Sequence, residues 1–208
     1  MSDWFQTPDL TLVPDGRRDG RTGLSMRGTI VWLTGLSGAG KTTLAHALCD
    51  SLQRSGRAVE ILDGDRIRQA LSAELGYSKA DRDLNVRRLG FLAKLLANHG
   101  ITVIVAAISP YRAARDEVRR EQDSLFMEVF VECPIDVLRA RDPKGLYERA
   151  LRGDIPEFTG ISSPYEPPLN PECQIRTDRQ SVDECLRSIL ETLQQLERST
   201  TGRAVSGT

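Results

Sequence analysis

The sequence predicts an α/β domain in which helices cover both faces of a mostly parallel sheet of five strands. From Thr29 onward, short runs rich in β-branched residues alternate with segments whose apolar residues recur every three to four positions. The run at 101–106 is apolar on both faces, which is typical of a buried parallel strand. A length of 208 residues suits one domain of this class.

The strands are assigned from the β-rich runs, and the helices from apolar residues that recur every three to four positions. The expected strands are residues 29–34, 58–62, 101–106, 126–131 and 173–176. One helix precedes Gly100, and its apolar stripe consists of Leu89, Leu92, Ala93 and Leu96. A last helix begins near Ser181, whose spacing to Glu184 matches a capping box, and ends near Arg198. We expect the first of these helices to lie with its apolar stripe on the sheet and the last one to close the domain.

The boundaries of the domain are placed by composition. Residues 1–27 contain several prolines and glycines and no sustained apolar period, so they are expected to form a mobile extension. Residues 199–208 are small and polar and are expected to be disordered. The folded domain is therefore predicted to span 28–198.

The segment 142–172 breaks the alternation of strands and helices. Its prolines and glycines leave room only for a short helix at about 146–151. A connection this long inside a compact domain is usually functional or disordered. Because it also carries basic and aromatic residues, a lid over a substrate is favoured over a linker.

Composition narrows the partners and the compartment. With 28 basic and 29 acidic residues, nothing in the overall charge indicates a nucleic-acid or membrane partner. The four cysteines form no C-x-x-C pair, so reduced, buried thiols are expected rather than a zinc site or a disulfide framework. The longest apolar runs have strand length, and the N-terminus lacks a secretory signal, so a cytoplasmic location is expected.

A phosphate-binding loop follows the first expected strand. It fits the pattern G-x-x-x-x-G-K-[ST] at every fixed position, with residues Gly35, Leu36, Ser37, Gly38, Ala39, Gly40, Lys41 and Thr42. Its backbone N–H groups can cradle an oxyanion, Lys41 can reach the β and γ phosphates of a nucleotide, and Thr42 can ligate Mg²⁺. The alternative is a plain turn with a solvated lysine, which the strand before it and the helix after it disfavour.

Two carboxylates follow the second expected strand, in Asp63-Gly64-Asp65. The carboxyl edge of a parallel sheet is where ligands bind in such folds. Phosphoryl transfer needs an acidic group for Mg²⁺ and for the attacking hydroxyl, and Asp63 is the candidate. An Asp-Gly turn with Asp63 as a helix N-cap is an alternative that is compatible with this role.

Two further segments bring polar side chains toward the same region. Tyr77, Arg82 and Asn85 lie close together at an expected helix start, where an anion site and a solvated helix terminus are equally supported. Ser109 follows the strand at 101–106. Its placement as an N-cap, with Pro110 at the first helical position, is a complete structural explanation, although its hydroxyl would still lie at the carboxyl edge.

Together these residues resemble the adenylylsulfate kinases, which transfer the γ-phosphate of ATP to the 3′-hydroxyl of adenosine 5′-phosphosulfate. The resemblance covers about residues 28–176 and implies a three-layer P-loop kinase-like fold with a lid. The motifs that carry it are Gly-Leu-Ser-Gly-Ala-Gly-Lys-Thr-Thr (35–43), Leu-Asp-Gly-Asp (62–65), Leu-Gly-Tyr-Ser (75–78), Asp81-Arg82 with Asn85, Ile-Ser-Pro (108–110), Asp-Pro-Lys-Gly-Leu-Tyr (142–147) and Phe-Thr-Gly-Ile (158–161).

The resemblance also implies roles for single residues. Residues 35–43, which end at Thr43, would hold ATP, and Arg141 would lie near its base. Thr42 and Asp63 would serve Mg²⁺, and the catalytic set would be Lys41, Asp63 and Ser109. The implied acceptor set is Asp65, Arg68, Tyr77, Arg82, Asn85, Ile108, Ser109, Lys144 and Phe158. Within it, Tyr77 and Phe158 would sandwich the acceptor adenine. Some family descriptions give Ser109 a phosphorylated intermediate, but in-line transfer needs no covalent step.

Three departures from the family pattern keep alternatives open. Arg66 stands where Asn is usual, Tyr77 where Phe is usual, and Glu157 where Asn often stands. A related kinase with another nucleotide-like or small hydroxyl acceptor is one alternative. A catalytically silent nucleotide-binding module is another, although the presence of Asp63 and Lys144 argues against it. The sequence also leaves open a homodimer and a functional coupling to a sulfurylase.

Overall fold

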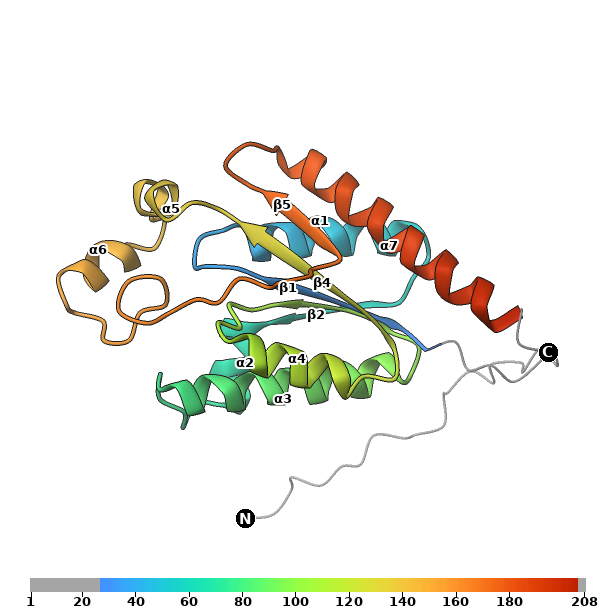
Figure 1. Cartoon of the computed structure of the whole chain (residues 1–208), viewed down its shortest axis with the longest axis horizontal. Helices are drawn as coiled ribbons and strands as arrows, with labels where there is room; N and C mark the ends of the chain where they lie inside the picture. Colours follow the sequence, from blue (N-terminus) through green and yellow to red (C-terminus); the bar gives the residue numbers. More distant parts are fainter. Residues whose placement is uncertain (1–26, 206–208) are drawn as a thin grey trace, which may run out of the picture.

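The structure is a computed structural model that describes the backbone of residues 27–205 and the side chains to residue 200. All but one residue of the expected N-terminal extension therefore lies outside the described residues. Within the described residues, five strands form one sheet in the order β2-β3-β1-β4-β5, and every neighbouring pair is parallel (Figure 1). The strands are β1 (Thr29–Thr34), β2 (Val59–Asp63), β3 (Thr102–Ala106), β4 (Leu125–Glu132) and β5 (Cys173–Arg176). They confirm the predicted sheet to within one residue at each end.

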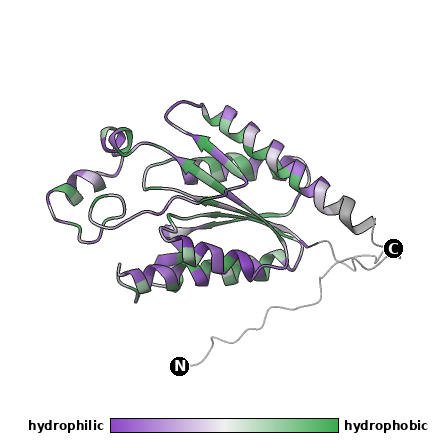
Figure 2. Ribbon diagram, viewed as in Figure 1, coloured by the Kyte–Doolittle hydropathy of each residue, from purple (hydrophilic) through white to green (hydrophobic). Residues whose placement is uncertain are grey.

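Helices cover both faces of this sheet and give three layers. The first face carries α1 (Lys41–Arg54) and α7 (Val182–Val205), and the other carries α3 (Lys79–Ala97) and α4 (Arg112–Arg120) (Figure 1). Alternate side chains of β1 enter the two cores, with Val31 and Leu33 on the α1 side. Trp32 enters the α3 side. Figure 2 shows the resulting pattern, in which apolar strands lie between helices that are apolar on one side.

The predicted stripe on α3 packs as expected. Leu89 and Ala93 are fully buried in the second core, and Leu92 and Leu96 pack against it. Ser78 caps this helix, since its hydroxyl accepts a hydrogen bond of 3.2 Å from the N–H of Asp81. The structure thus confirms the helix, which begins at Lys79, ten residues before the first residue of the stripe.

The last helix begins as predicted but ends later. The carboxylate of Glu184 accepts from the N–H of Ser181 at 2.7 Å, which completes the capping box. The helix does not end near residue 198, because α7 continues to Val205. The hydroxyls of Ser199 and Thr200 donate to the carbonyls four residues earlier, so these small polar side chains are satisfied inside the helix.

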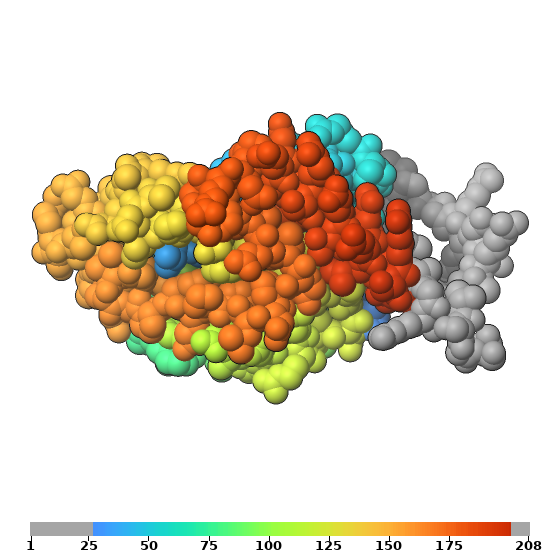
Figure 3. Space-filling model, turned by 45° about the horizontal axis from the view of Figure 1, so that its top comes forward, coloured from blue at the N-terminus to red at the C-terminus, as the bar shows by residue number. Residues whose placement is uncertain are grey.

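The segment 142–172 begins at the end of the molecule where the strands have their carboxyl ends, and its last residues run back to the start of β5 at the opposite edge (Figure 1). It follows α5 (Ile135–Arg141) and contains α6 (Leu146–Leu151), which confirms the short helix predicted there. From another side, Figure 3 shows a hollow between the yellow and orange parts of this region, with blue atoms from the beginning of the described chain at its bottom. Across residues 27–205, no helix has both the length and the apolar character that crossing a bilayer requires.

Candidate functional site

A cavity of about 310 Å³ lies at the carboxyl ends of β1, β2 and β3. It joins the phosphate-binding loop, the start of α2 (Gly64–Leu71), the first turns of α3 and the loop after β3. The predicted site residues on its wall are Ser37, Gly38, Gly40, Lys41, Thr42, Thr43, Asp63, Asp65, Arg68, Tyr77, Arg82, Asn85, Ile108, Ser109 and Lys144. Segments that are far apart in the sequence therefore meet where parallel α/β sheets bind their ligands.

The phosphate-binding loop has the conformation that its glycines permit. Gly38 and Gly40 have φ values of 74° and 96°, in the left-handed region that other residues rarely adopt. α1 begins directly after this turn, at Lys41, so its unpaired N–H groups and the positive end of its dipole face the cavity. The loop is therefore shaped as a cradle for an anion.

Lys41 lies over this cradle and is buried. Its Nζ donates hydrogen bonds to the carbonyl oxygens of Gly35 and Leu36, at 2.8 and 2.7 Å. Burial lowers the pKa of Lys41 to about 8, although the carboxylates of Asp65 and Asp63 counteract the shift. An ammonium group that is poorly compensated in this way is prepared to bind an anionic ligand.

Asp63 has two structural tasks at the end of β2. Its Oδ1 accepts from the N–H groups of Asp65 and Arg66, at 3.0 and 3.2 Å, and so caps α2. Its Oδ2 accepts from the hydroxyl of Thr42 at 3.0 Å. The N-cap considered for Asp63 is thus present, and the same carboxylate also contacts the threonine of the phosphate-binding loop.

The opposite wall combines an aromatic ring with two guanidinium groups. Tyr77 is 57% exposed, and the Cζ atoms of Arg68 and Arg82 lie 4.5 and 5.6 Å from the centroid of its ring. Arg82 also donates to the hydroxyl of Thr159 at 2.7 Å and to the carbonyl of Glu157. Burial lowers the pKa of Arg82, opposed mainly by Tyr111. This wall is suited to an anionic ligand that carries a flat ring.

Two further polar groups complete the wall. The buried Oδ1 of Asn85 has no hydrogen-bond partner among the described residues. A buried oxygen in this state is free to accept from a ligand. Lys144, from the segment 142–172, reaches across the cavity and donates to Oδ2 of Asp65 at 3.2 Å. The segment therefore contacts the acidic group that follows β2.

Ser109 lies on the wall but does not cap a helix. The prediction of an N-cap is wrong, because α4 begins at Arg112 after Tyr111. Ser109 is buried with a φ of 44°, and its hydroxyl accepts a hydrogen bond of 3.0 Å from the indole N–H of Trp32. Its hydroxyl is thus committed to the core of the sheet rather than to a helix terminus.

The segment 142–172 is attached to the phosphate-binding loop by a residue to which the sequence analysis gave no role. The hydroxyl of the buried Tyr147 donates to the carbonyl of Ser37 at 2.8 Å.

Asp142 caps α6 by accepting from the N–H groups of Leu146 and Glu148, at 2.8 and 3.0 Å. Burial acts to raise the pKa of Asp142, but the backbone N–H groups of Glu148 and its neighbours hold it below its usual value.

Five predicted site residues do not line this cavity. Gly35 and Leu36 turn their carbonyls to Lys41, and Ala39 is buried. Arg141 lines a separate cavity of about 150 Å³ beside the phosphate-binding loop and donates to the carbonyl of Thr177 at 2.8 Å. Phe158 packs edge-on against Tyr147, with ring centroids 5.1 Å apart.

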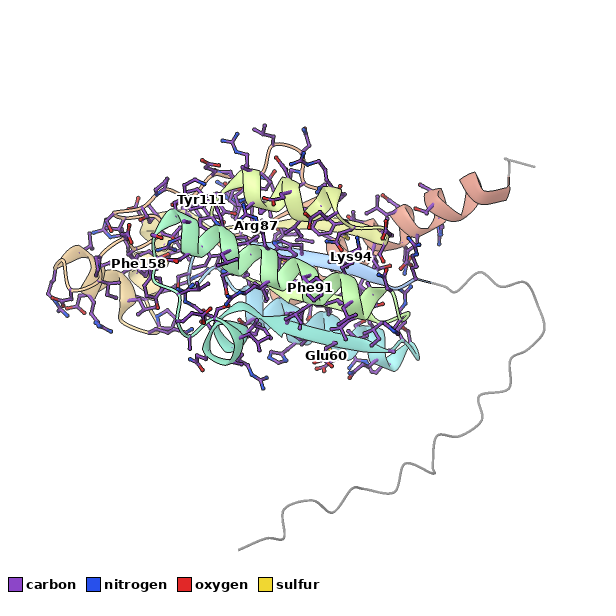
Figure 4. All side chains as sticks on the ribbon, turned by 90° about the horizontal axis from the view of Figure 1, so that it is seen from below. Glu60, Arg87, Phe91, Lys94, Tyr111 and Phe158 are labelled. Atoms are coloured by element: carbon purple, nitrogen blue, oxygen red, sulfur yellow. The ribbon has the colours of Figure 1, made fainter. Side chains whose placement is uncertain are left out.

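The position of Phe158 leaves one prediction open. Its ring lies toward the end of the molecule that carries the segment 142–172 (Figure 4). Tyr77 stands on the cavity wall without Phe158 opposite to it. The sandwich of an adenine between Tyr77 and Phe158 therefore stays a prediction.

The cavity also contains residues that the sequence analysis did not assign to the site. They are Gly64, Val86, Ala106, Ala107, Pro110 and Pro143. Most are neighbours of assigned residues in the motifs at 62–65, 108–110 and 142–147, and this adjacency was the available signal. Val86 and Ala106 belong to the apolar patterns of a helix and a strand, which gave no sign of a role in the site.

Comparison with known proteins places these features in a family. A family model described as adenylylsulphate kinase matches residues 27–176. The adenylyl-sulfate kinase of Chloroflexus aurantiacus is 58% identical over 170 residues, which are 82% of this chain and 91% of that protein.

Solved structures give the same result. The fold is similar to the Mycobacterium tuberculosis APS kinase CysC in complex with AMPPNP and APS, with a TM-score of 0.77 and 43% identity over 81% of this chain and 98% of that chain. It is also similar to a hexameric APS kinase from Thiobacillus denitrificans, with a TM-score of 0.61 and 39% identity over 82% of this chain and 29% of that chain.

Proposed function

The chain belongs to the adenylylsulfate kinase family, and we infer from this that it transfers the γ-phosphate of ATP to the 3′-hydroxyl of adenosine 5′-phosphosulfate. The product is 3′-phosphoadenosine 5′-phosphosulfate, so the reaction belongs to sulfate activation. The observation that carries the inference is the shared cavity, in which the anion cradle of the loop 35–42 and the basic, aromatic wall at Tyr77 face one space. The cradle suits the phosphates of one nucleotide, and the wall that faces it suits a second ligand that is anionic and carries a flat ring.

Binding of ATP follows from the family and from the cradle. We propose that Lys41 contacts the β and γ phosphates. Their negative charge would compensate the buried ammonium group. The N–H groups at the start of α1 would hold the phosphate oxygens, and Arg141 would lie near the base, beside the smaller cavity. These assignments rest on the loop geometry and on the hydrogen bonds of Lys41.

Mg²⁺ is proposed as the metal that accompanies ATP. The hydroxyl of Thr42 and the carboxylate of Asp63 are hard oxygen donors that lie 3.0 Å apart beside the cradle, which fits the ligands this ion prefers. When bound, Mg²⁺ neutralises charge on the transferring phosphate. Asp63 and Thr42 would orient it, and removal of Mg²⁺ by a chelator is expected to abolish turnover.

The transfer itself needs one base and a fixed acceptor. The 3′-hydroxyl oxygen forms a bond to the γ-phosphorus as the bond to the β–γ bridging oxygen breaks, and ADP leaves with that electron pair. We propose that Asp63 accepts the hydroxyl proton. Arg68, Arg82 and Lys144 would hold the anionic groups of the acceptor, and Asn85 would accept from its base.

The lid role of 142–172 is also a proposal. It is supported by Tyr147, which joins this segment to the phosphate-binding loop, and by Lys144, which reaches Asp65. Closure of a lid would exclude water, which otherwise competes with the acceptor hydroxyl for the phosphate.

A panel of acceptors tests the function. The chain is incubated with γ-labelled ATP and either adenylylsulfate, AMP, adenosine, shikimate or gluconate, and the labelled products are separated. We expect rapid transfer to adenylylsulfate only. Transfer to another compound, with none to adenylylsulfate, would refute the proposed acceptor. ATP binding without any transfer would instead support a silent nucleotide-binding module.

The assembly and the compartment are proposed on separate observations. An exposed apolar face on α3 contains Leu84, Phe91 and Leu95, and Phe91, labelled in Figure 4, is 68% exposed. Such a face supports a homodimer, which sedimentation of the chain and of Phe91→Asp would test.

The four cysteines are free and buried, which suits the reducing cytoplasm. Functional coupling to a sulfurylase is proposed only from the resemblance to the family.

A further inference from the structure

Arg115 is a buried arginine that lies outside the cavity and joins three parts of the fold. Its side chain is 2% exposed, and its Nε donates to Oε1 of Glu128 on β4 at 2.7 Å. Its two terminal nitrogens donate to carbonyl oxygens, Nη1 to Ser109 at 2.6 Å and Nη2 to Glu166 at 2.8 Å. A buried guanidinium is costly unless it is paired and hydrogen-bonded, and here each nitrogen has a partner.

The contact with Ser109 holds a backbone that does not adopt its shape freely. The φ of Ser109 is 44°, in the left-handed region that disfavours side chains other than glycine. Trp32 holds the hydroxyl of this residue at 3.0 Å, and Arg115 holds its carbonyl. Ser109 is thus fixed from two sides, and with it the wall of the cavity at Ile108 and Ser109.

The contact with Glu166 fixes the later part of the segment 142–172, at Tyr165 and Glu166, which we call its returning end. The N–H of Glu166 donates to the carbonyl of Pro110 at 2.8 Å, and its Oε2 accepts from the N–H of Arg112 at 2.9 Å. One residue earlier, the hydroxyl of Tyr165 lies 3.0 Å from that of Thr34 at the end of β1. The guanidinium of Arg115 therefore ties the loop 108–112 and the returning end of 142–172 into one unit.

We propose that Arg115 is a positioning residue for the acceptor substrate, a role that rests on the proposed function. Arg115 holds the carbonyls of Ser109 and Glu166 together. It thereby sets the distance between the cavity wall and the returning end of 142–172. The phosphate-binding loop is held by other contacts, namely those of Lys41 and Tyr147. The effect of Arg115 therefore falls on the acceptor and leaves the binding of ATP unchanged.

The variant Arg115→Lys tests this role with Arg119→Lys as its matched control. A lysine keeps the positive charge beside Glu128 but lacks the planar fork that reaches two carbonyls and the carboxylate at once. Arg119 is one turn further along α4, and its guanidinium pairs with Glu172 at 2.5 Å and with Glu128 at 3.2 Å. The control thus disturbs the same charged cluster without touching Ser109 or Glu166.

Steady-state kinetics of the full chain provide the first measurement. In Arg115→Lys, we expect the KM for adenylylsulfate to rise about tenfold while the KM for ATP stays within about twofold, and Arg119→Lys to change neither by more than that. A second measurement is the indole N–H proton resonance of Trp32, identified by its loss in Trp32→Phe. We expect a larger shift in Arg115→Lys than in Arg119→Lys, because Arg119 reaches Trp32 only through the ring of Phe126.

The outcomes separate this proposal from the proposed function. A wild-type chain that transfers no phosphate to adenylylsulfate would contradict the function. An active wild type, with both KM values unchanged or raised equally in Arg115→Lys, would overturn only the role of Arg115. If Arg115→Lys does not fold, the double variant Arg115→Met/Glu128→Met replaces it, because it leaves no unpaired buried charge at this pair. A selective rise in its KM for adenylylsulfate would support the role of Arg115, and unchanged or equally raised KM values would overturn it.

Discussion

The hydroxyl of Thr42 lies 3.0 Å from Oδ2 of Asp63 and joins the first turn of α1 to the end of β2. The other oxygen of the same carboxylate caps α2 through the N–H groups of Asp65 and Arg66. Asp63 is therefore held in place by its structural bonds while one oxygen faces the cradle. This fixed position suits the role proposed for Asp63, because a preorganised carboxylate needs no rearrangement before the transfer.

The variant Asp63→Asn separates the two tasks of this residue. Asn is about as good an N-cap as Asp, so the free energy of unfolding should change by less than about 1 kcal/mol. The amide cannot accept the hydroxyl proton or balance Mg²⁺, so we expect kcat to fall by about 10²–10⁴-fold. Urea unfolding and a coupled assay for ADP measure the two effects, with Asp136→Asn at the exposed start of α5 as the control. Near-normal turnover would refute the role of Asp63.

The lowered pKa of Lys41 predicts how stability depends on pH without ATP. Below pH 8 both states carry the proton, and the folded state bears the full cost of the buried charge. Between pH 8 and the ordinary value of 10.5, only the unfolded chain keeps the proton, so this contribution to stability rises with pH.

The comparison with Lys41→Met measures this contribution. The shift amounts to about 3 kcal/mol, since one pKa unit is about 1.4 kcal/mol. The free energy of unfolding of the wild type, minus that of the variant, should rise by up to this amount from pH 8 to 10.5. Burial raises the pKa of Cys49, Cys173 and Cys185, which acts in the opposite direction in both proteins and cancels in the difference. Parallel curves would show that Lys41 titrates normally.

The parts of the fold that the sequence predicts are those fixed by local patterns. The strands, the stripe on α3 and the capping box at Ser181 depend on residues within one or two turns of each other. The phosphate-binding loop is predictable for the same reason, because its glycines and the start of α1 are adjacent in the chain. Local chemistry suffices for these elements.

The prediction for Ser109 failed, and the role of Tyr147 was missed, because their partners lie far along the chain. Ser109 accepts from Trp32, which is 77 positions away, and this contact and that of Arg115 outweigh its preference for capping a helix. Tyr147 reaches Ser37 across 110 positions, so its role was not visible in the sequence. Such contacts follow from the packing of the whole sheet, which no short pattern specifies.

The hydroxyl of Tyr147 should matter mainly for ATP. In Tyr147→Phe the carbonyl of Ser37 loses its partner, so we expect a loss of about 1 kcal/mol in the free energy of unfolding. The phosphate-binding loop also loses its link to α6, and the KM for ATP should rise about three- to tenfold with a smaller change for adenylylsulfate. A stability loss with an unchanged KM for ATP would show that the bond is only structural.

The ion pair between Lys144 and Asp65 should contribute to binding and little to folding. Their side chains are 64% and 76% exposed, and such surface pairs contribute about 0–1 kcal/mol to stability. The pair nevertheless spans the cavity, so Lys144→Gln should raise the KM for adenylylsulfate about tenfold, and added salt should weaken binding less in the variant than in the wild type. Its control is Arg152→Gln, which breaks a comparably exposed pair with Glu148 on α6. Equal effects of the two variants, measured by kinetics at low and high salt, would show that the charge of the segment matters and not the position of Lys144.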